Sequence, residues 1–198
     1  MSQSLPEDLV TTALDQLSQE PAERLSLRQV AQSLGVSHQA PYVHFGSKRR
    51  FLAAVAGAGL QQAADHARSV LDATPDDPRL RLHALADAYM AFVSSRPHVH
   101  DLAYGPLVAK SDHPTLQQAA IDYWNLLHDT IHACQPEGTS EADTLRRSAA
   151  TWATVYGIAR LAAMNQIPNS VPGDMRSLVH EAIDTLHNGW RSTQTQNG

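Results

Sequence analysis

The stretch best suited to chemistry lies between residues 24 and 50, where basic side chains gather and acidic ones are absent. It holds five Lys or Arg residues and no Asp or Glu, although the whole chain has 15 basic and 20 acidic residues and a net charge of −5. Side chains that hydrogen-bond to bases or phosphates follow a Gly-Val-Ser turn at residues 35–37. Cations attract phosphates and amide side chains read base edges, so this window is typical of a nucleic-acid contact.

Histidines supply a second candidate chemistry. The group His98, His100 and Asp101, and the pair His128 and His132 at i, i+4, have donors that can bind transition metals. Such spacings also arise by chance among eleven histidines. A metal-responsive protein is therefore kept as an alternative, and no metal ligands are assigned.

Enzyme motifs are missing from the sequence. It contains no Gly-rich phosphate loop, no Cys-x-x-Cys, no His-Glu-x-x-His and no Gly-x-Ser-x-Gly. The single Cys134 fits a small core residue in a reducing cytoplasm better than a nucleophile, and Asp76 and Asp77 fit a helix start. We expect a protein that is not an enzyme and has no cofactor. A helical ligand-binding protein or an enzyme without DNA binding is a less favoured alternative.

Helical periodicity runs nearly from end to end, and no alternating strand pattern of useful length occurs, so the sequence predicts an all-α fold of about nine helices. With 42% hydrophobic residues the chain can bury a core. No apolar run approaches the about 20 residues that span a membrane, and no signal peptide is visible, which predicts a cytoplasmic protein without a membrane partner. Capping and breaking residues place the helices near residues 5–17, 26–34, 37–45, 47–71, 78–95, 98–104, 114–134, 141–165 and 174–190.

Two of these helices, short and joined by a Gly-containing turn, outline a helix-turn-helix. The first begins with a capping box, Ser26-x-x-Gln29, and Gly35 supplies the left-handed residue that ends it. Ser37 is expected to cap the second helix, which would present its first residues to a DNA groove. Pro41 then becomes the fourth helical residue, and we expect it to form a stiff, apolar first turn that contacts a thymine methyl group.

The same residues resemble the N-terminal domain of TetR-type transcriptional regulators. That family's signature is an Ala in the first helix of the motif, Gly-Val-Ser in the turn, Tyr-x-His-Phe in the recognition helix and a Lys that opens helix four. All four parts are present between Ser26 and Lys48, within a resemblance that covers residues 5–56. Further on, Trp-Ala-Thr-Val-Tyr-Gly at residues 152–157 is similar to a Trp-Ala-x-x-His-Gly element of one TetR subgroup, with Tyr156 in place of His.

The resemblance implies a DNA-binding domain at residues 1–50 and a ligand-binding and dimerisation domain at residues 51–198. It also implies a ligand-responsive repressor that binds an inverted-repeat operator in double-stranded DNA as a homodimer and responds to an unidentified small-molecule effector. Gln39 is expected to read a base and Lys48 to hold a phosphate. The full predicted DNA-binding set is Ser26, Arg28, Ser37, His38, Gln39, Ala40, Pro41, Tyr42, His44 and Lys48.

The last two helices carry more apolar surface than one partner can cover. Residues 141–165 have two apolar stripes, which predicts self-association. The predicted interface residues are Leu145, Val155, Ile158, Met175, Leu178, Val179, Ala182 and Leu186. The resemblance further implies an effector cavity among helices four to eight, and the residues expected to line it are Tyr89, Phe92, Trp124, His128, Trp152 and Tyr156.

Overall fold

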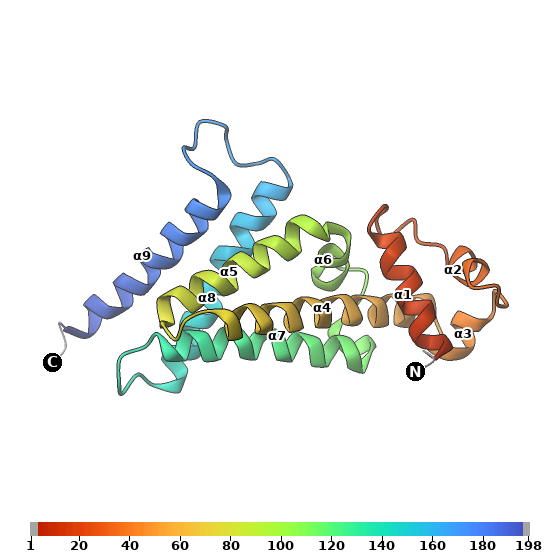
Figure 1. The fold of residues 1–198 in the computed structure, drawn as a ribbon, viewed down its shortest axis with the longest axis horizontal. Helices are drawn as coiled ribbons and strands as arrows, with labels where there is room; N and C mark the ends of the chain where they lie inside the picture. The colour runs from red at the N-terminus through yellow and green to blue at the C-terminus, as the bar shows by residue number, and fades with distance from the viewer. Residues whose placement is uncertain (1–3, 196–198) are drawn as a thin grey trace. The chain divides into compact units, whose positions relative to one another are not determined.

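The computed structural model describes residues 4–195, with side chains described as far as Trp190. Over that range the chain has nine α-helices, one short 3-10 helix and no strand, which confirms the predicted all-α fold (Figure 1). The elements are α1 (Leu5–Leu17), α2 (Leu27–Ser33), α3 (Ala40–Phe45), α4 (Lys48–Ala73), α5 (Pro78–Ser95), α6 (Pro97–Tyr104), η1 (Lys110–Asp112), α7 (Pro114–Ala133), α8 (Glu141–Ala163) and α9 (Met175–Thr195).

Most helices begin where a capping side chain satisfies the first unpaired amides. The carboxylate of Asp77 accepts a hydrogen bond from the backbone amide of Leu80 at 2.8 Å, at the start of α5. Asp174 does the same at the start of α9, and the hydroxyl of Ser140 does so at the start of α8. These are local interactions between residues three apart, so the sequence signals found them.

Contacts between Cα atoms divide the chain into two compact units. Unit 1 consists of Met1–Asp65 and Ser95–Tyr123, and unit 2 of His66–Ser94 and Trp124–Gly198. Unit 1 therefore includes more than the N-terminal helices, because it also takes in most of α4, all of α6 and η1, and the start of α7. The predicted functional division at residue 50 does not follow this grouping and stays a prediction.

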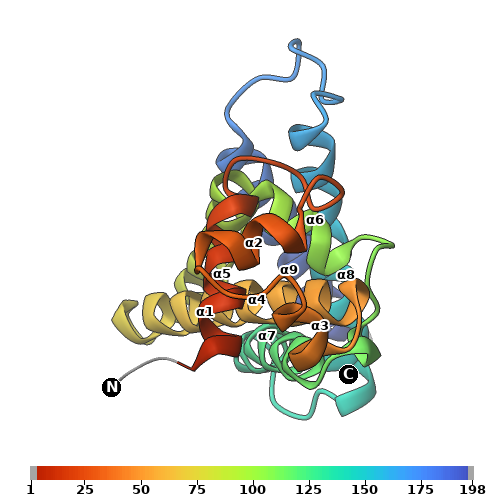
Figure 2. The same cartoon turned by 90° about the vertical axis from the view of Figure 1, so that its right-hand side faces the viewer.

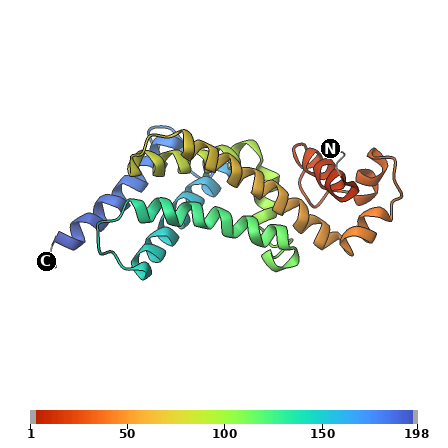
Figure 3. The ribbon, with the colours of Figure 1, turned by 60° about the horizontal axis from the view of Figure 1, so that its bottom comes forward.

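In unit 1, α1, α2 and α3 pack on one another and α1 also contacts α6 (Figure 2). The fully buried side chains of this core include Leu9, Leu17, Leu25, Val30, Phe51, Val55, Leu60, Leu102 and Leu116. Helices α4 and α7 run side by side at Gly57 (Figure 3), where a Cβ atom would lie only 2.5 Å from the backbone nitrogen of Leu116. Glycine is required there because the two backbones meet directly.

Unit 2 is built on α5, α8 and α9 together with the ends of α4 and α7, and α8 packs along α9. Two residues predicted for the dimer interface belong to its core, because Val155 is 6% exposed and Val179 is 0% exposed. Both side chains pack inside the protomer, so the prediction that they contact a partner is wrong. Ile183, which the sequence analysis did not single out, is buried beside them on α9.

Matching polar side chains join α5 to α9 within unit 2. Each helix carries an Arg, a His and an Asp at four-residue spacing, Arg79, His83 and Asp87 on α5 and Arg176, His180 and Asp184 on α9. The carboxylate of each helix accepts hydrogen bonds from the Arg and the His of the other helix. The rings of His83 and His180 stack between the two carboxylates, with centroids 4.1 Å apart. We call these six residues the α5–α9 clamp.

Candidate nucleic-acid interface

The turn between α2 and α3 has the geometry of a helix end closed by glycine. Gly35 has a φ of +66°, and the amide of Val36 donates to the carbonyl of Ala31 at 3.0 Å. The amide of Gly35 donates to Gln32, which completes a Schellman motif. At the other end of α2, the hydroxyl of Ser26 accepts a hydrogen bond from the amide of Gln29 at 3.4 Å. Gly35 therefore has the role predicted from the sequence.

The recognition helix begins later than the sequence analysis predicted. Helix α3 starts at Ala40, with Gln39 as the residue before it. Ser37 belongs to a separate turn, in which its hydroxyl accepts from the amide of Gln39 at 3.3 Å and its carbonyl from the amide of Ala40 at 2.9 Å. Pro41 is consequently in the first turn of the helix, where a missing N–H costs no intrahelical hydrogen bond.

Burial also corrects the role predicted for Pro41. Its side chain is buried, because α3 packs on α1 and α2 through this residue's side of the helix. A buried ring cannot reach a thymine methyl group, so the predicted DNA contact of Pro41 is wrong. Phe45 behaves as the core residue it was expected to be, and its ring meets Phe51 edge to face at 5.0 Å.

The remaining polar residues of the motif surround a cleft of about 600 Å³. Its lining combines the start of α2, the turn before α3, the exposed side of α3 and the start of α4, through Ser26, Leu27, Arg28, His38, Gln39, Tyr42 and Lys48. Six of the ten residues predicted to bind DNA thus lie around one cleft. Ser37 and His44 are exposed outside it, and Ala40 is half-buried.

Charge in this cleft favours a polyanion. Arg28 and Lys48 are exposed cations, and the lining includes no Asp or Glu. Lys48 is the first residue of α4, whose unpaired amides and helix dipole also attract a phosphate. The hydroxyl of Ser47 accepts a hydrogen bond from the amide of Arg50 at 3.2 Å and fixes this end of the helix. The site can therefore hold phosphates around the side chains of Gln39 and Tyr42.

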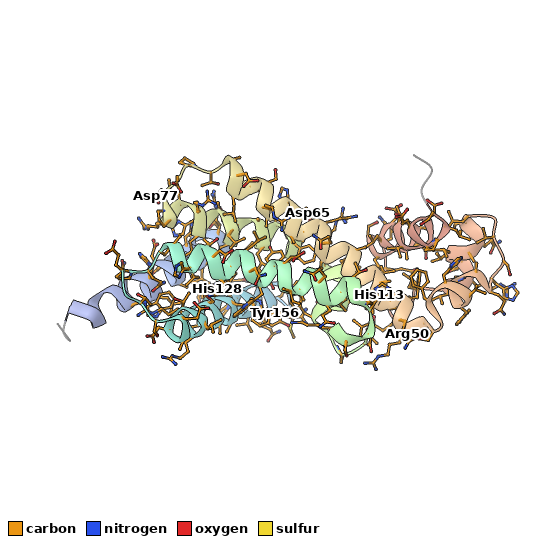
Figure 4. All side chains as sticks on the ribbon, turned by 90° about the horizontal axis from the view of Figure 1, so that it is seen from below. Arg50, Asp65, Asp77, His113, His128 and Tyr156 are labelled. Carbon is orange, nitrogen blue, oxygen red and sulfur yellow. The ribbon has the colours of Figure 1, made fainter. Side chains whose placement is uncertain are left out.

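Two basic residues that follow Lys48 have different surroundings. Arg49 pairs with Asp112 of η1 at 2.6 Å, and Asp112 also accepts from the amide of Ala109. The backbone hydrogen bond from Ala109, together with Arg49, lowers the pKa of Asp112. Arg49 is thus tied to the segment between α6 and α7, whereas Arg50 is exposed at the start of α4 (Figure 4).

One exposed residue of α3 escaped the sequence analysis. Val43 is 78% exposed, the most of any large hydrophobic residue in the described part of the chain. It lies four residues after Gln39, so the two side chains share one face of the helix. This spacing was visible in the sequence, but a valine in a helical pattern is ordinarily a core residue.

Comparison with known proteins identifies the family. A family model for bacterial regulatory proteins of the tetR family matches residues 9–55, and a model for the tetracyclin repressor-like C-terminal domain matches residues 82–186. The chain belongs to the TetR family. This TetR-family chain is accordingly a DNA-binding transcriptional regulator, and the cleft lies in the matched N-terminal region. No curated protein matches the chain at a significant level.

Solved structures share the fold of this TetR-family regulator. A protein of unknown function from Rhodococcus sp. RHA1 is 27% identical, with 95% of this chain and 96% of that one covered at a TM-score of 0.77. The TetR family regulator PfmR from Thermus thermophilus is 15% identical, with 91% and 97% covered at 0.61. A TetR variant from Acinetobacter baumannii AYE in complex with minocycline is 19% identical, with 97% and 98% covered at 0.65.

The residues predicted to line an effector cavity are only partly brought together. Trp152 stands edge to face against Trp124 with centroids 6.4 Å apart, and Tyr156 lies 6.0 Å from Trp152. Tyr89 and Phe92 are buried on α5. His128, labelled with Tyr156 in Figure 4, lies 3.1 Å from Glu141.

A different set of residues lines the pocket in unit 2. They come from α5, α8 and α9, and none of the six predicted residues is among them. The prediction of the lining residues is therefore wrong for this pocket. Aromatic side chains fill the space between helices, and the pocket lies where smaller ones leave it open.

The alternative functions find little in the described residues. No group of three or more His, Cys, Asp or Glu side chains there could hold a metal ion, so His98, His100 and Asp101 do not form a site. Burial raises the pKa of the Cys134 thiol to about 11, which does not favour a nucleophile. No helix of the described chain has both the length and the apolarity to cross a membrane.

Exposed apolar side chains gather on α8. Leu145 is 41% exposed, Trp152 36%, Leu161 48% and Met164 57%. Of the other predicted interface residues, Ile158 is half-buried on α8, and α9 contributes the half-buried Met175, Leu178, Ala182 and Leu186. The exposed face of α8 is defined here by Leu145, Trp152, Leu161 and Met164. It is the surface that an isolated protomer leaves uncovered.

Proposed function

We propose that this TetR-family regulator is a ligand-responsive repressor that binds an inverted-repeat operator as a homodimer. The observation that carries the proposal is the acid-free cleft formed by α2, α3 and the start of α4. Helix-turn-helix proteins insert the N-terminal part of the second helix into the major groove. In that arrangement Gln39 contacts a base, and Arg28 and Lys48 contact phosphates on either side.

Base reading on this face involves Val43 as well as Gln39. The amide of Gln39 can bond an adenine at two positions, and an exposed apolar side chain favours the methyl group of thymine. Val43 takes the role that was first assigned to Pro41, because it is exposed and Pro41 is buried. His44 and Ser37, which are exposed outside the cleft, are proposed as additional phosphate contacts.

Homodimerisation is supported by the exposed face of α8. A symmetric pair of α8 and α9 helices would cover these side chains and give two reading heads, as an inverted repeat needs. Leu161→Glu should shift the protein from dimer to monomer in sedimentation velocity. Leu80→Glu is the matched control, because Leu80 is 50% exposed on α5. Equal dissociation of both variants, or of neither, would contradict the assignment of this face.

A small-molecule effector is proposed to release the DNA. The Acinetobacter baumannii TetR variant is a structural neighbour that binds minocycline, and this chain has a pocket in unit 2 that is large enough for a small molecule. An effector acts by binding the two conformations of the regulator with different affinity. Repression, rather than activation, follows the commoner behaviour of the family.

The proposed DNA contact can be tested with Lys48→Ala. After selection of the preferred site from random DNA, binding is measured by fluorescence anisotropy at several salt concentrations. Loss of one phosphate contact should weaken binding to all sequences and reduce the salt slope by about 0.9 per half-site. Arg146→Ala is the control, since Arg146 is an exposed cation of α8 that pairs with Asp143. An unchanged slope for Lys48→Ala would remove this residue from the interface.

A further inference from the structure

The pocket in unit 2 is apolar along most of its length. It has a volume of about 600 Å³, within the range of small-molecule sites, and lies between α5, α8 and the start of α9. Ala159, Ala162 and Ala163 form the α8 side, so this helix leaves room that larger side chains would fill. Met90 and Met175 face the same space, and their flexible thioethers can adapt to chains of different shape.

An ion pair of the α5–α9 clamp forms the polar end of this pocket. Asp87 and Arg176 both line it. The Nε of Arg176 donates to both oxygens of Asp87 at 3.1 and 3.0 Å, and its Nη2 donates to Oδ2 at 2.7 Å. His180 Nε2 lies 2.8 Å from Oδ1 of the same carboxylate. Each carboxylate oxygen thus already has two donors.

The two partners of this pair therefore differ in what they still offer to a ligand. A carboxylate has about four lone-pair sites, and those of Asp87 are occupied by Arg176 and His180. Burial opposes the charge of Asp87, but the hydrogen bonds from Arg176 and His180 outweigh it and lower the pKa, so Asp87 stays ionised. The Nη1 group of Arg176 takes no part in these bonds, and the side chain is 70% exposed. The polar end presents donors on an accessible cation.

We propose that this pocket binds an amphipathic carboxylate, with its anionic head on Nη1 of Arg176 and its apolar chain between the alanines of α8 and Met90 and Met175. The solvent-accessible guanidinium keeps the head partly hydrated, whereas the chain leaves water. An amine is disfavoured, because Arg176 repels it and Asp87 has no acceptor site left. That this ligand is the effector rests on the proposed function, but its binding does not.

Titration calorimetry with decanoate, and with decylamine as the probe of opposite charge, tests the proposal. The wild-type protein should bind one decanoate per protomer and bind decylamine at least tenfold more weakly, at about 1.4 kcal/mol per tenfold change. Arg176→Gln should weaken decanoate binding about tenfold and leave decylamine unchanged or tighter. Ala162→Phe fills the pocket and should abolish both.

The clamp provides a matched control for these variants. Arg79→Gln removes the equivalent ion pair to Asp184, but Arg79 does not line the pocket, so decanoate binding should stay within about twofold of the wild type. Melting curves of all variants establish that each is folded. Undetectable decanoate binding to the wild type, equal binding of both probes, or equal effects of Arg176→Gln and Arg79→Gln would overturn the proposal.

Regulation is measured separately from binding. If decanoate binds with the expected dependence on Arg176 but leaves operator affinity unchanged, the pocket stands and its effector role fails. If operator binding occurs and decanoate does not bind, the pocket proposal fails and the DNA-binding function stands.

Discussion

Replacing Asp184 by Asn should measure what the α5–α9 clamp contributes to stability. Asp184 of α9 accepts a hydrogen bond from Nε of Arg79 at 2.8 Å and lies 2.9 Å from Nε2 of His83, both on α5. An ionised carboxylate only accepts, so the ring of His83 must donate. The Arg79 hydrogen bond is the main cause that lowers the pKa of Asp184 to about 2. An asparagine side chain at this position could neither carry the charge nor accept from both partners.

The magnitude follows from this pKa. Lowering the pKa of Asp184 from 3.8 to about 2 sets an upper bound of about 2.4 kcal/mol, at about 1.36 kcal/mol per unit. Arg79 is 61% exposed and Asp184 23% exposed, so solvent and salt screen the pair. A reduction to about 1 kcal/mol is expected, in line with partly exposed ion pairs elsewhere.

The dependence on pH has a definite sign. The folded-state pKa of Asp184 lies below its unfolded value, so its contribution is complete above about pH 5 and is lost as the pH falls through about 2. Asp184→Asn should therefore be about 1 kcal/mol less stable than the wild type at neutral pH. The difference should shrink as the pH falls below about 4, because the wild type loses the same charge.

Urea unfolding followed by circular dichroism, at neutral pH and at steps down to about pH 3, measures both effects. Glu181→Gln is the matched control, because Glu181 is exposed on the same helix and has no ion pair within the described residues. The reasoning fails if Asp184→Asn is as stable as Glu181→Gln at neutral pH. It also fails if the difference grows on acidification.

Three further substitutions test the DNA-reading domain. Gln39→Ala should change base preference at one position of each half-site, costing about 1–3 kcal/mol there, and an unaltered selection profile removes Gln39 from base reading. Pro41→Ala should lower the free energy of unfolding by about 1 kcal/mol and leave base preference unchanged, since Pro41 is buried; altered preference with unchanged stability would restore the DNA contact. Gly57→Ala should cost about 1–3 kcal/mol in urea unfolding, because its Cβ would lie 2.5 Å from the nitrogen of Leu116. Unchanged stability would contradict that close approach.

Helix boundaries that depend on neighbouring residues could be predicted from the sequence. Asp77 with Pro78, Ser140 and Asp174 mark the starts of α5, α8 and α9, and each acts on an amide three residues away. The start of α3 could not be fixed in this way. A serine can cap a helix or a turn equally well, and Ser37 caps a turn. The choice depends on how Pro41 packs against α1 and α2, which local sequence does not reveal.

Charged pairs between distant residues were beyond the sequence. Arg49 and Asp112 are 63 residues apart, and Arg79 and Asp184 are 105 apart. The repeated Arg, His and Asp spacing of the clamp is visible on each helix by itself. Only the packing of α5 on α9 sets the register in which each carboxylate meets the opposite Arg and His.

The candidate sites show the same contrast between type and surroundings. Around the DNA-binding cleft, residue types and spacing named most of the lining, because the helix-turn-helix is a local structure. The pocket of unit 2 was missed because an apolar side chain in a helical stripe looks the same whether it fills a core or borders a cavity. Trp152 and Tyr156 pack against each other, and the cavity is bordered by alanines instead.

Helix α8 connects the proposed effector pocket with the proposed dimer contact. It is one continuous helix of 23 residues that exposes Trp152 and Leu161 on one face and places Ala159 and Ala162 in the pocket wall. A ligand that displaces this wall would move a rigid element that also forms the contact between protomers. Linkage then requires reciprocity: the factor by which decanoate changes the dimer equilibrium must equal the factor by which dimerisation changes decanoate affinity. Measuring both factors on the same protein decides whether α8 couples the two sites or merely contributes to each.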